Sequence, residues 1–145
     1  MILFSSDLES TFKNKIIMNK LIIDAVNEKI FLMIITKDNI YNITKENTKI
    51  NYEKLTLIIK DFLRSSSVEL ENIDKIYVNR GPGSFAGIRN SLSVIKAFKV
   101  AKKIDYYSYS FEDFIGEIDI KYQSIPDLCN KFKIEKNLIN PNYLS

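Results

Sequence analysis

Apolar residues along the chain follow two patterns: short runs typical of buried strands, and longer stretches with helical spacing. Three short runs come first, separated by polar turns, and they predict an antiparallel meander. A later run follows the first predicted helix, so we expect it to lie parallel to the first strand. The predicted strands are residues 20–25, 30–36, 40–44, 75–79 and 105–110, with a further candidate at 117–122.

Two stretches carry apolar residues at every third or fourth position, which predicts amphipathic helices. The first is residues 52 to about 65, capped by Asn51, and the second is residues 85–103, capped by Ser84. Short helices are predicted at residues 111–115, capped by Ser110, and at residues 126–132. The order β-β-β-α-β-α-β predicts an α/β fold with a mixed sheet and helices packed on it, as in ribonuclease-H-like and actin-like domains.

Residues 1–17, which precede the first predicted strand, match none of the predicted elements of this fold. Asp7 and Glu9 interrupt the apolar region that a targeting peptide would need. Since Met18 immediately precedes the strand, we interpret residues 1–17 as an N-terminal extension, with translation starting at Met18. The alternative is a short surface helix over residues 6–15.

A glycine-rich turn at residues 81–87 joins a predicted strand to the longest predicted helix. Pro82 would set φ near −65° at the first corner, and Gly83 would tolerate a positive φ at the second. Such a junction aims several backbone N–H groups at one point, which suits either an anion or a closely packed neighbour. The weak candidates for cofactor binding are Asp24, Gly81, Gly83 and Ser84.

Two nucleotide-binding motifs are disfavoured at this turn. A Walker-type loop fails because Ala86 and Gly87 stand where glycine and lysine are required. A dinucleotide site needs an acid at the carboxyl end of the next strand, but Asp105 stands at the opposite end, where its strand begins.

Composition removes further classes of chemistry. The 145 residues include no histidine, which is the commonest general base and metal ligand, and a single cysteine, Cys129. No Ser–His or Cys–His pair can form, so we discount a peptidase and predict no catalytic residue, no metal site and no cofactor. An unpaired cysteine fits a reducing cytoplasm, and no apolar run approaches the roughly 20 residues that span a bilayer. The net charge is only +3 and the lysines are scattered along the chain, so the charge gives no independent case for tight nucleic-acid binding.

The turn and its flanks resemble the signature of the TsaB (YeaZ) family. Residues 79–89 read Asn-Arg-Gly-Pro-Gly-Ser-Phe-Ala-Gly-Ile-Arg, where the family has roughly G-R-G-P-G-S-F-T-G-L-R. The chain departs from that pattern at Asn79, Ala86 and Ile88. Four other segments are also similar to family motifs. Ile23-Asp24 matches the start of the family's opening I-D-T-S, with Ala25 and Val26 in place of the two hydroxyl residues. Residues 51–53 correspond to H-S-E, residues 109–113 to a strand end followed by S-S-L-E-A, and residues 141–145 to P-x-Y-L-R.

The resemblance implies a TsaB-like first lobe over residues 18–116, with residues 117–145 as the remnant of a strongly shortened second lobe. It implies a non-catalytic subunit that binds and supports the catalytic subunit TsaD in making threonylcarbamoyladenosine beside the tRNA anticodon. A TsaE-like ATPase is a further candidate partner, a homodimer is a candidate state in isolation, and tRNA contact would be indirect or weak, with no membrane. The implied partner interface comprises Leu55, Ile59, Phe85, Ala86, Arg89, Ser93 and Ala97.

A different class of function also stays open. The chain could be a small nucleotide-binding enzyme that uses the 81–87 loop as its phosphate site. Asp24 would then be the metal ligand at the end of the first strand.

Overall fold

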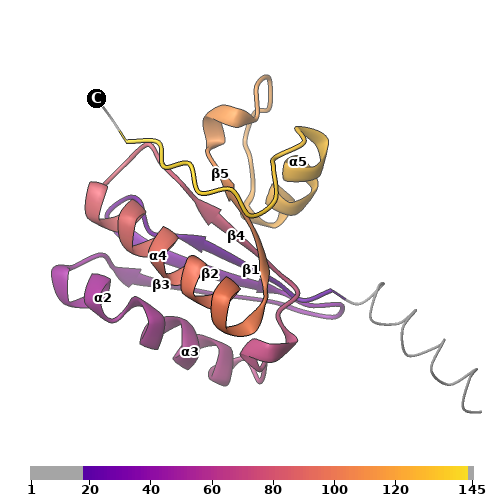
Figure 1. Cartoon of the computed structure of the whole chain (residues 1–145). Coiled ribbons are helices and arrows are strands. Elements are labelled where there is room, and N and C mark those ends of the chain that lie inside the picture. Colours follow the sequence, from indigo (N-terminus) through magenta and orange to yellow (C-terminus); the bar gives the residue numbers. More distant parts are fainter. Residues whose placement is uncertain (1–17, 144–145) are drawn as a thin grey trace, which may run out of the picture.

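The computed structural model describes residues 18–143, and it contains a five-stranded mixed sheet in the order β3-β2-β1-β4-β5 (Figure 1). Strands β1 to β3 are antiparallel, whereas β4 and β5 run parallel to β1, so the predicted sheet is confirmed. In register, Ile22 of β1 lies between Met33 of β2 and Tyr77 of β4. The strands are β1 (Lys20–Asp24), β2 (Lys29–Ile35), β3 (Ile40–Glu46), β4 (Lys75–Asn79) and β5 (Asp105–Tyr109).

One face of the sheet is covered by helices that come from the middle of the chain (Figure 1). These are α2 (Lys49–Glu53), α3 (Leu55–Ser65) and α4 (Phe85–Lys102), with a 3-10 turn η1 (Leu70–Asn72) before β4. Alternate residues of the strands, such as Leu21 and Ile23, point into this layer. They pack with Ile59 of α3 and Ile88 of α4, all of them 0% exposed. Burial of this apolar face is the main stabilising contribution to the lobe.

The other face is covered by the chain that follows β5. It begins with η2 (Phe111–Asp113), continues through η3 (Tyr122–Ser124) and ends its helical part with α5 (Ile125–Lys131). Ile22 and Tyr77 of the sheet pack there against residues that include Phe114, Ile125 and Cys129. This second layer is smaller than the first, and it packs on residues of β2, β1, β4 and β5.

Several predicted boundaries were wrong. The first helix begins at Lys49, where the Thr48 hydroxyl accepts from the Asn51 amide at 3.2 Å, so Asn51 is not its cap. Residues 117–122 form no strand and lead into η3 instead. The cap at Ser110 is confirmed, although the helix that it starts is only a 3-10 turn.

Two further points concern the chain as a whole. The predictions for residues 1–17, an extension or a surface helix, lie outside the described residues. Across residues 18–143, none of the helices has the length and apolar character needed to cross a membrane.

Candidate functional site

The glycine turn has a different geometry from the one expected. Gly81 carries the positive φ, +111°, and the Gly81–Pro82 peptide is cis, whereas Gly83 does not have a positive φ. Gly83 is needed for close approach instead, because a Cβ at this position would overlap the backbone carbonyl oxygen of Val26. The prediction that Gly83 supplies the left-handed corner was therefore wrong, and the β1–β2 turn pressing on the loop is the reason.

Three backbone amides of the loop, those of Gly81, Ser84 and Gly87, have protein acceptors. The Gly81 N–H donates to Asn79 Oδ1 at 2.9 Å, and the Ser84 N–H donates to the Val26 carbonyl at 2.7 Å. The Gly87 N–H donates to Ser84 Oγ at 3.2 Å, which is the predicted helix cap. Of the two uses that a glycine-rich junction allows, these contacts favour the closely packed neighbour over a bound anion.

Asp24, at the end of β1, is buried with 3% of its surface exposed. Its Oδ2 accepts from the Tyr122 hydroxyl at 2.7 Å and from Asn79 Nδ2 at 3.2 Å. Its Oδ1 accepts from the Val26 amide at 3.4 Å, as expected for an acid that caps the β1–β2 turn. Burial, and then the charge and hydrogen bond of Asp24, raise the pKa of Tyr122. The buried carboxylate is thus held by protein donors from three parts of the chain.

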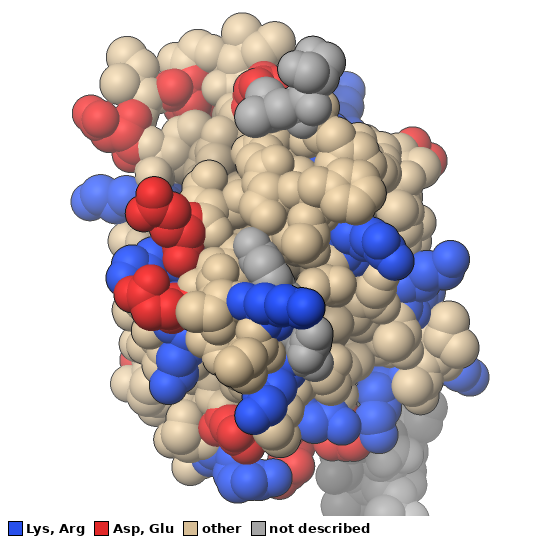
Figure 2. Space-filling view, turned by 90° about the vertical axis from the view of Figure 1, so that its left-hand side faces the viewer, with Lys and Arg blue, Asp and Glu red and all other residues tan. Residues whose placement is uncertain are grey.

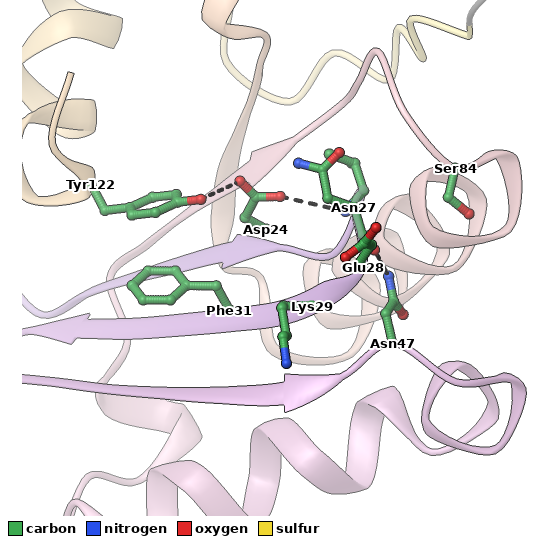
Figure 3. A pocket seen from close by; sticks show the side chains of 9 residues that line it. Asp24, Asn27, Glu28, Lys29, Phe31, Asn47, Ser84 and Tyr122 are labelled. Atoms are coloured by element: carbon green, nitrogen blue, oxygen red, sulfur yellow. Dashed lines mark hydrogen bonds between the residues drawn. The ribbon is translucent and has the colours of Figure 1, made fainter. Parts of the chain in front are cut away.

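A pocket of about 830 Å³ opens beside Asp24 (Figure 3). The rings of Phe31 and Tyr122 stack on one side with centroids 4.1 Å apart. Lys29 also lines the pocket, but its ammonium group is paired with Glu46. The full lining is Asp24, Val26, Asn27, Glu28, Lys29, Phe31, Asn47, Ser84 and Tyr122.

The chemistry of this pocket is poorly suited to phosphate. It holds the carboxylates of Asp24 and Glu28, while its one cation, Lys29, has an anionic partner. Within residues 18–143 there is no group of three histidine, cysteine or acidic side chains that could hold a metal ion. On the face that Figure 2 shows, acidic side chains lie on the left next to Lys and Arg, and further acidic side chains lie among the basic ones below. This face therefore has no continuous basic surface for a nucleic acid.

The exposed side of α4 forms a second candidate site. Phe85, the first residue of the helix, is 58% exposed, and Val100, near its end, is 77% exposed. Between them lie five exposed residues at helical spacing: Ala86, Arg89, Ser93, Lys96 and Ala97. We call Phe85, Ala86, Arg89, Ser93, Ala97 and Val100 the α4 face, and the Lys96 cation lies within it. The helix buries its opposite side against the sheet.

Two residues of the expected interface lie elsewhere. Leu55 and Ile59 of α3 are 1% and 0% exposed and belong to the core beneath the helices. Their spacing predicted an apolar stripe correctly, but the sheet of this chain already covers it. The exposed apolar side chains of this region are Ile50 and Leu57, at 62% and 52%, which lie outside the stripe.

Comparisons with known proteins agree with this fold and motif. Residues 45–110 match the family model described as "TsaD: tRNA N6-adenosine threonylcarbamoyltransferase". Over 90 residues, or 62% of this chain, the sequence is 26% identical to the tRNA threonylcarbamoyladenosine biosynthesis protein TsaB of Buchnera aphidicola subsp. Schizaphis graminum. The resemblance to the TsaB (YeaZ) family is confirmed.

Solved structures support the fold. YeaZ from Pseudomonas aeruginosa superposes with a TM-score of 0.60 at 22% identity over 64% of this chain. A Pseudomonas aeruginosa protein described as uncharacterized, with similarity to peptidase YEAZ, gives the same three values. The chain therefore has an α/β, actin-like lobe. The matches span 43% of the TsaB relative and 44% and 43% of the two structures, so the chain covers less than half of each.

The TsaB-like signature contains one residue whose contacts the sequence did not indicate. Arg80 Nη2 forms a 2.7 Å ion pair with Asp113, and Nη1 donates to the Asn140 carbonyl at 3.2 Å. The Arg80 carbonyl also accepts from the Asn142 amide at 2.7 Å. The signature arginine thus faces the C-terminal part of the chain, and no periodicity in the sequence could have revealed a contact between segments so far apart.

Proposed function

We propose that this chain is a non-catalytic subunit in the synthesis of threonylcarbamoyladenosine on tRNA. It would bind and support a TsaD-like catalytic subunit through the α4 face. The observation that carries the proposal is the exposed face itself, a row of small and apolar side chains on a helix that starts at the TsaB-like signature. The similarity to TsaB gives the process, since the relative is named for threonylcarbamoyladenosine biosynthesis.

The composition of the α4 face fits close packing against another helix. Ala86, Ser93 and Ala97 are small, so a second helix backbone can approach closely along this side. Phe85 and Val100 supply large apolar groups at the two ends. Arg89 adds a cation of the kind enriched in protein interfaces. A row of this kind on a small lobe is typical of a binding surface.

The similarity to two families indicates which partner would fit. Residues 45–110, which include α3 and α4, match the TsaD family model. A TsaD-like chain would therefore present a related pair of helices. Related surfaces can pair around an approximate two-fold axis, much as identical surfaces do in a homodimer. The same reasoning makes a homodimer a candidate state without the partner.

A supporting role rather than catalysis is favoured by the residues present. The sequence has no histidine, and the loop amides of Gly81, Ser84 and Gly87 are bonded within the chain. We assign residues 18–116 to the TsaB-like lobe and residues 117–145 to the remnant of a second lobe. The cytoplasm, where tRNA is modified, is the expected location.

The test is co-expression with the TsaD-like protein of the same organism, followed by measurement of affinity by biolayer interferometry. Ala97→Glu would place a negative charge among the small residues of the α4 face and should weaken binding by at least about tenfold. Asn130→Glu is the matched control, because Asn130 is exposed on α5 at the other face of the sheet. Absence of a complex at micromolar concentration, with tRNA modification intact after depletion of this protein, would rule the proposal out.

A further inference from the structure

Residues 137–143 form an extended segment that we call the C-terminal strap. It leaves α5 and crosses beside β5 toward the start of α4, as the yellow trace in Figure 1 shows. Its first residues bind the edge of β5. The Asn137 amide donates to the Tyr106 carbonyl at 2.8 Å, and the Tyr106 amide donates to Asn137 Oδ1 at 2.9 Å. The buried Ser108 hydroxyl donates to the Leu138 carbonyl at 2.7 Å.

The far end of the strap lies on the glycine turn. The Asn142 amide donates to the Arg80 carbonyl at 2.7 Å. The Asn142 carbonyl fills the space that a Cβ at Gly81 would need. One residue further, the ring of Tyr143 lies 4.7 Å from the ring of Phe85. The strap therefore contacts both the turn that leads into α4 and the first residue of that helix.

Arg80 holds the middle of the strap in place. Its side chain, 16% exposed, donates to the Asn140 carbonyl and is itself fixed by the ion pair with Asp113. Charge-assisted bonds of this kind have well-defined geometry, especially where water is largely excluded. Arg80 precedes Gly81, so one residue connects the strap with the turn.

We infer that the C-terminal strap controls the first turn of α4, with Arg80 as the positioning residue. When the strap is bound, Asn142 fixes the turn at Gly81 and Tyr143 restrains the Phe85 ring. When the strap is released, both restraints are lost together. The inference rests on the proposed function in one respect: Phe85 is the first residue of the α4 face, so the strap would regulate partner binding through it.

Linkage makes this control reciprocal. If the partner binds the strapped form more tightly, then partner binding must also stabilise the strap by the same factor. The strap is thus a built-in means of coupling the edge of β5 to the proposed interface. Release of the strap at β5 should loosen the first turn of α4 at Phe85, although Ser108 and Asn137 form their hydrogen bonds with Leu138 and Tyr106.

Hydrogen exchange on the isolated chain tests the first step without any partner. Ser108→Ala with Asn137→Ala removes side-chain anchors at β5. We expect amide exchange to quicken by about tenfold both in residues 137–143 and in residues 84–88, with α3 unchanged. Thr44→Ala with Asn130→Ala is the matched control, because both side chains are exposed on other elements. Faster exchange of the strap with unchanged exchange at 84–88 overturns the inference.

A second variant covers the case in which the double substitution destabilises the whole chain. Tyr143→Ala leaves the strap hydrogen bonds in place and removes the ring from Phe85. Exchange should then quicken at residues 84–88 while the unfolding temperature stays the same. Unchanged exchange there overturns the inference.

The affinity of the strap variants for the TsaD-like subunit tests the second step. A fall of about tenfold supports regulation through the strap. If the wild-type chain binds and the variants bind equally well, regulation is ruled out. If the wild-type chain does not bind, the proposed function fails, and the exchange data alone decide whether the strap controls the first turn of α4.

Discussion

The hydroxyl of Tyr122 donates a 2.7 Å hydrogen bond to the buried carboxylate of Asp24 and so ties the segment after β5 to the end of β1. Asp24 is 3% exposed, so its charge depends on protein donors rather than on water. The bond also closes one wall of the pocket, where the Tyr122 ring stacks on Phe31. The end of β1 and the segment after β5 are therefore joined at this carboxylate.

Tyr122→Phe should lower the free energy of unfolding by about 1.5–3 kcal/mol, because a hydrogen bond to a buried charge is lost while the ring stays. Urea unfolding followed by circular dichroism gives the value. Tyr41→Phe is the matched control, since Tyr41 is 38% exposed on β3. Equal losses in the two variants would show that the bond to Asp24 contributes little.

Gly87→Ala should destabilise the chain by more than about 2 kcal/mol, because the new Cβ would overlap the carbonyl oxygen of Ala25. Gly116→Ala separates this clash from backbone strain. Gly116 has φ of +87° but nothing within 4 Å of a built Cβ, so its loss should be about 1 kcal/mol. Thermal unfolding of both variants measures the difference. A smaller loss of stability at Gly87 than at Gly116 would mean that the first turn of α4 does not pack against Ala25 as described.

Asp105 should make stability depend on pH in the acid range. Hydrogen bonds from Lys99 and Asn137 lower the pKa of Asp105 from 3.8 to about 2. A carboxyl with a lowered folded pKa stabilises the chain above its unfolded pKa, and this stability is lost as pH falls from about 4 to about 2. Asp105→Asn should therefore cost stability at neutral pH and little at pH 2, measured by urea unfolding at each pH.

The control for this pH series is Asp38→Asn. Asp38 is exposed, and within residues 18–143 it forms no ion pair. Its variant should follow the wild type at all pH values. A gap between Asp105→Asn and the wild type that persists at pH 2 would contradict the assignment to this carboxyl. Because Asp105 is about a third exposed, the effect should also shrink in high salt.

Calorimetry with ATP and magnesium addresses the alternative of a nucleotide-binding enzyme. We expect no saturable heat at the concentrations that fill ordinary nucleotide sites, because the amides of Gly81, Ser84 and Gly87 are bonded within the chain and the pocket carries carboxylates. Saturable binding that Asp24→Asn abolishes would favour the enzyme over the supporting subunit. Urea unfolding of the variant shows whether any loss of binding reflects loss of fold.

Local patterns predicted much of the lobe. Residues 75–79 form a short apolar run without polar alternation, which predicts a buried strand, and β4 has those bounds. The helix after the glycine turn begins where its cap predicts, since Ser84 Oγ accepts from the Gly87 amide. These features depend on neighbours in the sequence, which is why sequence spacing could identify them.

Contacts between distant segments could not be predicted in this way. The sequence pattern cannot tell whether an apolar stripe faces the sheet of its own chain or a partner, so Leu55 and Ile59 were placed at the wrong surface. The positive φ was predicted at Gly83 but is found at Gly81, because Val26 and Asn142, far apart in the sequence, both pack against the turn. The contacts of Arg80 have the same origin.

The C-terminal strap has a consequence for the order of folding during synthesis. Strand β5 and the glycine turn leave the ribosome before residues 137–143 do, so the edge of β5 is unpaired for part of translation. An unpaired edge is a site where another chain can add. The contacts between Asn137 and Tyr106 and between Asn142 and Arg80 span long stretches of sequence, which slows their formation. The β5 edge is therefore most open to wrong pairing in the interval before residues 137–143 leave the ribosome.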